Sequence, residues 1–166
     1  MNANPIASTD LVLFDIDGVV ADDSHRVEFA VRKLWGPYFE LIGQDTPLQR
    51  GFELAWKYAN TAGTEVQYLT GRRVDLYQGT STWLRDHGFP NPESITMRGF
   101  AHRNILAKYK ESVFRSALES GRYRSIVLFE DDPAVVDHLN ATFGEGSAVL
   151  CDWYVKNPEM VKYAQA

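Results

Sequence analysis

Carboxylate, hydroxyl and basic side chains that could carry out one reaction follow separate apolar segments of this chain. The acidic and hydroxyl residues at these positions are Asp15, Asp17, Thr70, Glu130 and Asp131. Several carboxylates beside a hydroxyl and a lysine suit phosphoryl transfer, in which the catalyst mainly positions an anionic group and offsets its charge. Mg²⁺ is the natural counter-ion, because it prefers oxygen ligands from one or two carboxylates, water and phosphate. The pattern therefore predicts a magnesium-dependent site for phosphoryl transfer.

Asp15 and Asp17 end an apolar run that begins at Leu11. Large apolar and β-branched residues in a run are typical of a strand that is buried on both faces of a parallel sheet. Side chains two positions apart on a strand point the same way, so both carboxylates could face one ligand. Gly18 permits a sharp turn out of the strand. The alternative is an ordinary strand followed by an Asx turn, since Asp and Gly are common turn residues.

Apolar runs alternate with helical patterns along the rest of the chain. Further strands are expected at 66–70, 95–97, 125–129 and 148–150. One helix should be capped by Thr46, have Pro47 at its first position and end near Gly63. Other helices are expected at about 71–88, 102–121 and from Pro133 onward.

This alternation predicts an α/β fold, with a Rossmann-like parallel sheet and helices on both of its faces. Residues 24–42 have a helical pattern that Gly36 and Pro37 should break into shorter pieces. We therefore expect a small, cap-like helical insertion at about 22–45, after the first strand. The carboxyl ends of parallel strands meet at one edge of the sheet, where such folds bind their ligands.

The composition favours one domain, residues 1–166, because 166 residues with a hydrophobic fraction of 45% can bury a single core. No apolar stretch approaches the ~20 residues of a membrane span, and the start of the chain lacks the pattern of a signal peptide. Cys151 is the single cysteine, in agreement with a reducing compartment. We therefore expect a cytoplasmic protein without a membrane partner. A net charge of −5 provides no general attraction for polyanions, so any anion site must be local.

Four motifs resemble those of the haloacid-dehalogenase-like phosphatase superfamily, in the same order. They are Asp15-Ile16-Asp17-Gly18-Val19-Val20, Thr70-Gly71-Arg72, a lysine in the helix around Lys108 and Lys110, and Glu130-Asp131-Asp132. The resemblance extends from Leu11 to about Asp152. It implies the fold of that superfamily and the hydrolysis of a phosphorylated substrate with Mg²⁺ as cofactor.

The resemblance also implies a role for each matching residue. Asp15 would be the nucleophile that forms an aspartyl-phosphate, and Asp17 would be the general acid and then the general base. Thr70 would bind the phosphoryl oxygens. Asp15, Asp131 and the backbone carbonyl of Asp17 would hold the metal ion.

The lysine and the acidic motif leave alternatives open. Lys110 fits the pattern better than Lys108, because apolar residues follow it one turn later, but an ordinary surface lysine is the alternative for either. Glu130 and Asp132 flank the expected metal ligand and are candidates for an outer shell around it.

Residues that flank the four motifs carry a narrower resemblance: Val19-Val20-Ala21-Asp22, Trp83-Leu84, Gly88, Met97-Arg98 and Val135-Val136. With them the chain resembles the phosphatase half of phage-type polynucleotide kinase/phosphatases, which removes 3′-phosphates from nucleic-acid ends. The chain contains no Gly-x-x-x-x-Gly-Lys-Ser/Thr motif, so we expect a phosphatase without the kinase half. A short insertion would leave the cleft open to a DNA or RNA end. The candidate substrate-binding residues are Gly71, Arg72, Arg98 and Arg103.

Three aromatic residues of the insertion, Trp35, Tyr38 and Phe39, could stack a base or form the core of the insertion. Two other functions remain open: a small-molecule phosphatase of the nucleotide-monophosphate type, and a non-catalytic protein that binds a phosphorylated partner. The presence of both Asp15 and Asp17 argues against the second, because a binding protein needs no general acid.

Overall fold

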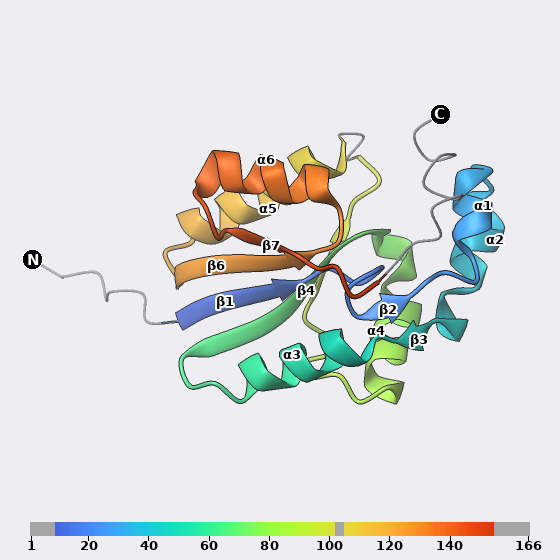
Figure 1. Ribbon diagram of the computed structural model, residues 1–166, viewed down its shortest axis with the longest axis horizontal. Coiled ribbons are helices and arrows are strands. Elements are labelled where there is room, and N and C mark those ends of the chain that lie inside the picture. The colour runs from blue at the N-terminus through green and yellow to red at the C-terminus, as the bar shows by residue number, and fades with distance from the viewer. Residues whose placement is uncertain (1–8, 102–104, 155–166) are drawn as a thin grey trace, which may run out of the picture.

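A parallel sheet of five strands, in the order β5-β4-β1-β6-β7, forms the centre of the computed structural model, which describes residues 9–101 and 105–154. The strands are β1 (Thr9–Phe14), β4 (Thr64–Arg73), β5 (Ile95–Arg98), β6 (Tyr123–Glu130) and β7 (Ala148–Leu150). Every neighbouring pair in this sheet is parallel. The order places β1 between β4 and β6, the three strands that deliver the acidic and hydroxyl residues (Figure 1).

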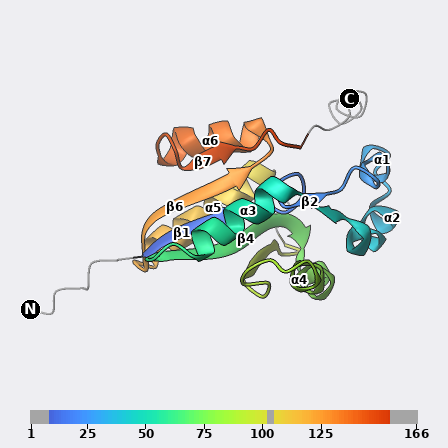
Figure 2. The ribbon, with the colours of Figure 1, turned by 60° about the horizontal axis from the view of Figure 1, so that its bottom comes forward.

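Helices cover both faces of the sheet (Figure 2). The helices are α3 (Gln49–Ala59), α4 (Tyr77–Asp86), α5 (Leu106–Glu119) and α6 (Pro133–Phe143). Val12 and Phe14 of β1 join one buried cluster with residues of α3 and α4. Leu11 and Leu13 point to the opposite face and join a second cluster with α5 and α6. This alternation explains the continuous apolar run, and the predicted α/β fold is confirmed.

The small helical insertion after the first strand is present. It comprises α1 (Val27–Val31), α2 (Trp35–Glu40) and the 3-10 turn η1 (Ile42–Gln44). The expected break at Gly36 and Pro37 was wrong, because both residues lie in the first turn of α2, where the missing N–H of proline costs little. The break falls instead at Lys33, whose φ is 57°.

The helix start predicted at Thr46 and Pro47 was also wrong. These residues form β3 (Thr46–Pro47), which pairs antiparallel with β2 (Ala21–Asp22). A proline is tolerated in such a short edge strand. The helix α3 begins at Gln49, after Leu48, whose N–H donates to the carbonyl of Val20.

Other element ends follow the sequence more closely. Gly88 and Gly121 have φ of +74° and +67° in the turns after α4 and α5, as expected for residues that close helices in the left-handed region. β4 is longer than expected and continues to Arg73, and the 3-10 turn η2 (Val74–Leu76) then leads into α4. Within the described residues, none of the helices has the length and apolar character needed to cross a membrane.

Candidate active site

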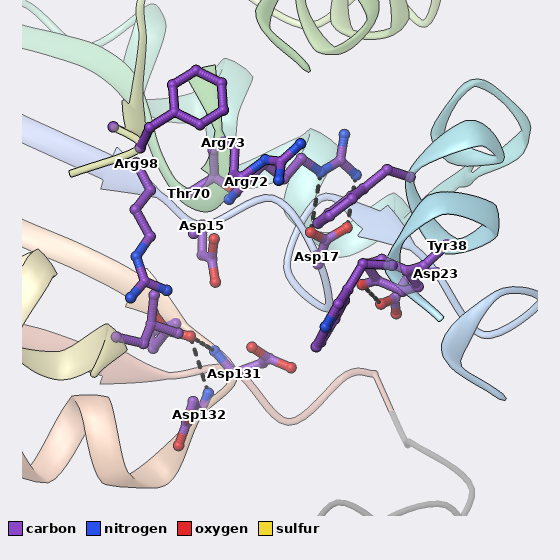
Figure 3. A pocket seen from close by; sticks show the side chains of 17 residues that line it. Asp15, Asp17, Asp23, Tyr38, Thr70, Arg72, Arg73, Arg98, Asp131 and Asp132 are labelled. Carbon is purple, nitrogen blue, oxygen red and sulfur yellow. Dashed lines mark hydrogen bonds and ion pairs between the residues drawn. The ribbon is translucent and has the colours of Figure 1, made fainter. Parts of the chain in front are cut away.

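One pocket lies at the carboxyl ends of β1, β4 and β6, where the chain leaves the sheet (Figure 3). Its cavity volume is about 550 Å³. Asp15 and Asp17 reach it from the end of β1, Thr70 from β4, and Asp131 from the end of β6. The tertiary structure therefore brings together side chains that are far apart in the sequence, as the strand order requires.

Three carboxylates gather at the centre of this pocket. One oxygen each of Asp15, Glu130 and Asp131 lies within 4.8 Å of the others. Lys110 contacts two of these carboxylates: its Nζ lies 3.0 Å from Oδ2 of Asp15 and also donates to Oε2 of Glu130. Lys110 and Glu130 have no exposed surface, and Asp15 is 6% exposed.

A divalent cation fits this cluster. Asp15 and Glu130 are buried and Asp131 is partly buried, and carboxylates this close together repel one another when they are ionised. Burial raises the pKa of Asp15 and of Glu130, an effect that Lys110 only partly offsets. Carboxylate oxygens are ligands that hard divalent cations prefer. Gly18, with φ of +81°, leaves the necessary space, because a Cβ there would lie 2.2 Å from Oδ2 of Asp131.

The two oxygens of Glu130 already have partners. Oε2 accepts from Lys110, and Oε1 accepts from the backbone N–H groups of Asp131 and Asp132 at 3.0 and 3.1 Å. Asp132 accepts from the N–H of Ala134 and caps α6. In this arrangement Glu130 orients Lys110 and the turn that carries Asp131, and Asp132 holds the start of α6.

The structure separates the two candidate lysines. Lys110 is buried against Asp15, whereas the side chain of Lys108 is 55% exposed and pairs with Glu111. Burial disfavours the charge on Lys110, but the nearby Asp15 and Glu130 outweigh this effect and hold its pKa above the usual value. Lys110 therefore stays protonated beside Asp15.

If the site hydrolyses phosphate esters, as the resemblance implies, replacing Lys110 by Met should lower kcat/KM by about 10²- to 10³-fold, the loss typical for a preorganised donor that offsets developing charge. Lys108→Met is the matched control, because Lys108 lies on the same helix but points to solvent. Steady-state rates and melting temperatures of both variants check this prediction. Equal rates for the two variants would contradict it.

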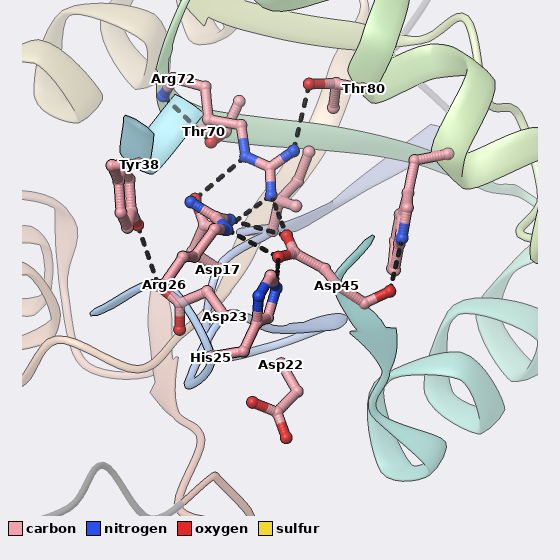
Figure 4. Close-up of polar contacts among 12 residues, drawn as sticks. Asp17, Asp22, Asp23, His25, Arg26, Tyr38, Asp45, Thr70, Arg72 and Thr80 are labelled. Carbon is pink, nitrogen blue, oxygen red and sulfur yellow. Dashed lines mark hydrogen bonds and ion pairs between the residues drawn. The ribbon is translucent and has the colours of Figure 1, made fainter. Parts of the chain in front are cut away.

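Asp17 belongs to a second buried network, which contains Arg26, Arg72 and Asp45 (Figure 4). Arg72 donates to both oxygens of Asp17, at 3.1 and 2.7 Å, and Arg26 donates to Oδ1 at 2.6 Å. Both arginines also donate to Asp45, at distances of 2.6 to 2.9 Å. Two guanidinium groups thus face two carboxylates, and the network is electrically balanced.

The arginines set the protonation state of Asp17. Burial opposes ionisation of its carboxyl group, but the charges and hydrogen bonds of Arg72 and Arg26 outweigh burial and hold the pKa of Asp17 well below its usual range. Asp17 is therefore ionised before any substrate binds. Its planar, bidentate contact with Arg72 also fixes its orientation.

The four residues expected to bind substrate have different surroundings. Gly71 and Arg98 line the pocket. Arg72 also lines it, but its side chain is 1% exposed and donates hydrogen bonds to Asp17, Asp45 and Thr80. Arg103 lies outside the described residues. Thr70 is 1% exposed, and its Oγ1 accepts the N–H of Arg72 at 3.2 Å, so it also shapes the turn after β4.

Sequence reasoning missed Arg26, Asp45 and Asp23. Arg26 has no exposed surface, and neither it nor Asp45 follows a strand of the main sheet, so no local pattern marked them. Asp23 is 4% exposed and accepts from the hydroxyl groups of Tyr38 and Tyr154, at 2.9 and 2.6 Å. Burial raises the pKa of Asp23. These two hydrogen bonds join α2 to the residues after β7.

Solved structures with the same fold include phosphatases. A class C acid phosphatase from Bacillus anthracis, solved with tungstate bound, superposes with a TM-score of 0.61 at 17% identity, over 95% of this chain and 78% of that one. A chain of the Pnkp1/Rnl/Hen1 complex superposes with a TM-score of 0.67 at 17% identity, over 86% of this chain. The match spans 45% of the length of that chain. No protein-family model and no curated protein sequence matches.

These similarities show that the α/β fold of this chain also occurs in known phosphatases. The chain shares its fold with a class C acid phosphatase and with a component of an assembly described as an RNA repair complex. At 17–18% identity these similarities define the fold and not the activity.

Proposed function

We propose that this protein is a magnesium-dependent phosphomonoesterase that acts through an aspartyl-phosphate and removes the 3′-phosphate from a nucleic-acid end. The main observation in support is the position of Asp15, which lies against Lys110 and within reach of Asp131, in a pocket that Asp17 also lines. Nucleophile, acid and counter-charges thus lie around one cavity that has room for a phosphate.

In the first step an oxygen of Asp15 attacks phosphorus, and the bond to the leaving alcohol oxygen breaks. Lys110 offsets negative charge on Asp15 and on the transferred group, and the Thr70 turn positions the phosphoryl oxygens. Mg²⁺, when bound by Asp15, Asp131 and the backbone carbonyl of Asp17, would neutralise phosphate charge. Water then attacks the aspartyl-phosphate, which releases inorganic phosphate and restores Asp15.

Asp17 would give a proton to the leaving oxygen and later take one from the attacking water. Its low pKa suits the second task, because the carboxylate is ionised. The first task requires a proton, and the negative charge of a bound phosphate raises the pKa of a nearby carboxyl group. Arg26 and Arg72 hold Asp17 in place through both steps and are therefore positioning residues.

A nucleic-acid end is the substrate that the surroundings of the pocket favour. The insertion is short, and a small lid leaves the pocket accessible to the end of a strand. Arg73 and Arg98 line its wall, as suits a phosphate-rich ligand. The resemblance to the phosphatase half of phage-type polynucleotide kinase/phosphatases points to the same substrate, and one structural neighbour comes from an RNA repair complex.

Measuring phosphate release from three substrates tests this proposal. The substrates are a 3′-phosphorylated oligonucleotide, the same oligonucleotide with a 5′-phosphate, and a 3′-mononucleotide. We expect the highest kcat/KM with the first, and loss of activity after chelation that returns with Mg²⁺. Equal or faster hydrolysis of the mononucleotide would instead support a small-molecule phosphatase. If none of these substrates and no generic aryl phosphate is hydrolysed, the result would favour a non-catalytic protein that binds a phosphorylated partner.

A further inference from the structure

Three aromatic rings and one guanidinium form a wall of the same pocket, which we call the aromatic wall: Trp35, Phe39, Arg73 and Phe100. Trp35 and Phe39 come from α2 of the insertion, Arg73 ends β4, and Phe100 follows β5. All four line the cavity that also contains Asp15. The mechanism of phosphate transfer uses none of them.

Contacts within the aromatic wall hold its members together. The rings of Trp35 and Phe39 are 6.0 Å apart at an angle of 23°, a stacked arrangement. Cζ of Arg73 lies 5.7 Å from the ring centre of Phe39 and 5.3 Å from that of Phe100. Arg73 therefore connects the insertion with the segment after β5 by cation–π contacts on both sides.

The exposure of the rings distinguishes them from core residues. Trp35 is 50% exposed and Phe100 is 64% exposed, whereas Tyr38 on the same helix is 9% exposed. Tyr38 thus belongs to the core of the insertion, and its hydroxyl is bound to Asp23. Trp35 is not buried in that core. Neighbouring large rings left in water beside a polar site are typical of a ligand-binding surface.

We propose that the aromatic wall stacks the nucleobase of the nucleotide whose phosphate is removed. This inference rests on the proposed function, because the phosphate would occupy the carboxylate end of the same cavity. A flat aromatic face stacks on any base, so the contact would select nucleotides without selecting a sequence. Arg73, which contacts the rings of Phe39 and Phe100, would hold these two rings in position beside the base.

The test compares hydrolysis of a 3′-phosphorylated oligonucleotide with that of an otherwise identical one whose terminal nucleotide is abasic. We expect the wild type to prefer the intact end by about 5- to 150-fold in kcat/KM, the range that stacking of one base is worth. In Trp35→Ala and Phe100→Ala this preference should fall toward one, mainly through a higher KM for the intact end. Trp35→Phe, which keeps a ring, should restore much of it.

Trp56→Ala is the matched control. Trp56 lies on α3, is 39% exposed, and is bound through its Nε1 to the carbonyl of Gly88, outside the pocket. This variant should keep the wild-type preference for the intact end. An equal loss on intact and abasic ends in Trp35→Ala and Phe100→Ala would overturn the inference, because the aromatic wall would then act only through the fold.

Failure of the proposed function gives a different result. If the protein is not a phosphatase, the wild type hydrolyses neither the two ends nor glycerol phosphate. Equilibrium binding of the same two oligonucleotides, measured by fluorescence anisotropy, then tests whether the aromatic wall stacks a base. The inference is supported if the wild type binds the intact end more tightly and Trp35→Ala loses this preference. Equal affinity of the wild type for intact and abasic ends overturns it.

Discussion

Asp15→Asn is expected to lower kcat for phosphate-ester hydrolysis by about 10⁴- to 10⁶-fold, the scale on which loss of a catalytic nucleophile acts in other enzymes with covalent intermediates. An amide has the size of the carboxylate but does not form the aspartyl-phosphate. Acid quenching during turnover should trap phosphate on the wild-type protein and none on the variant. Single-turnover rates and mass spectrometry of the quenched protein provide the measurements.

The fold of this variant should remain intact. Burial raises the pKa of Asp15, so removing its charge should change the free energy of unfolding little. Lys110 also keeps its hydrogen bond to Glu130. Asp10→Asn is the matched control, because it makes the same change near the opposite end of β1, where Asp10 pairs with Arg124. Near-native turnover in Asp15→Asn would refute its role as nucleophile.

Asp45→Asn should reduce the free energy of unfolding by about 3–5 kcal/mol, as expected when one partner of a buried ion pair is removed. The side chain of Asp45 is 0% exposed, and its oxygens accept hydrogen bonds from Arg26 and Arg72 and also contact His25. Without it, two buried guanidinium groups share the single charge of Asp17. Such a loss is a large part of the 5–15 kcal/mol that is typical for a domain. Urea denaturation followed by circular dichroism measures it.

Glu93→Gln serves as the control for this prediction. Glu93 forms an ion pair with Arg85 on the surface, where both side chains are at least half exposed. Exposed pairs contribute little to stability, so the midpoint of unfolding should hardly move. A similarly small change for Asp45→Asn would mean that the buried network carries little net stabilisation.

The order of strands and helices was predictable because it depends on local patterns. Short apolar runs, and helical patterns bounded by glycine or proline, indicate strands and helices wherever they occur. The errors fell at element ends. Thr46 and Pro47 looked like a helix start, but their backbone groups pair with β2, a partner more than twenty residues earlier. Pairing between residues that are distant in the sequence cannot be predicted from the residue types of a short segment.

The candidate site was predictable in part for the same reason. The carboxyl ends of parallel strands converge, so Asp15 and Asp131 could be expected at one place, and their carboxylates lie within 4.8 Å. The buried network of Arg26 and Asp45 could not be anticipated, because a charged residue is most often exposed. Only packing reveals that these two face each other at 2.6 Å.

The sequence by itself determined the fold class and the acidic residues that follow β1 and β6, because hydrophobic periodicity and residue type are local properties. Only the tertiary structure decided that Lys110 rather than Lys108 meets Asp15, that Arg72 is paired to Asp17, and that Trp35 stays exposed at the pocket. These outcomes depend on which surfaces of distant segments come into contact. Burial and charge pairing are properties of the packed molecule, so they emerge only when the whole chain is folded.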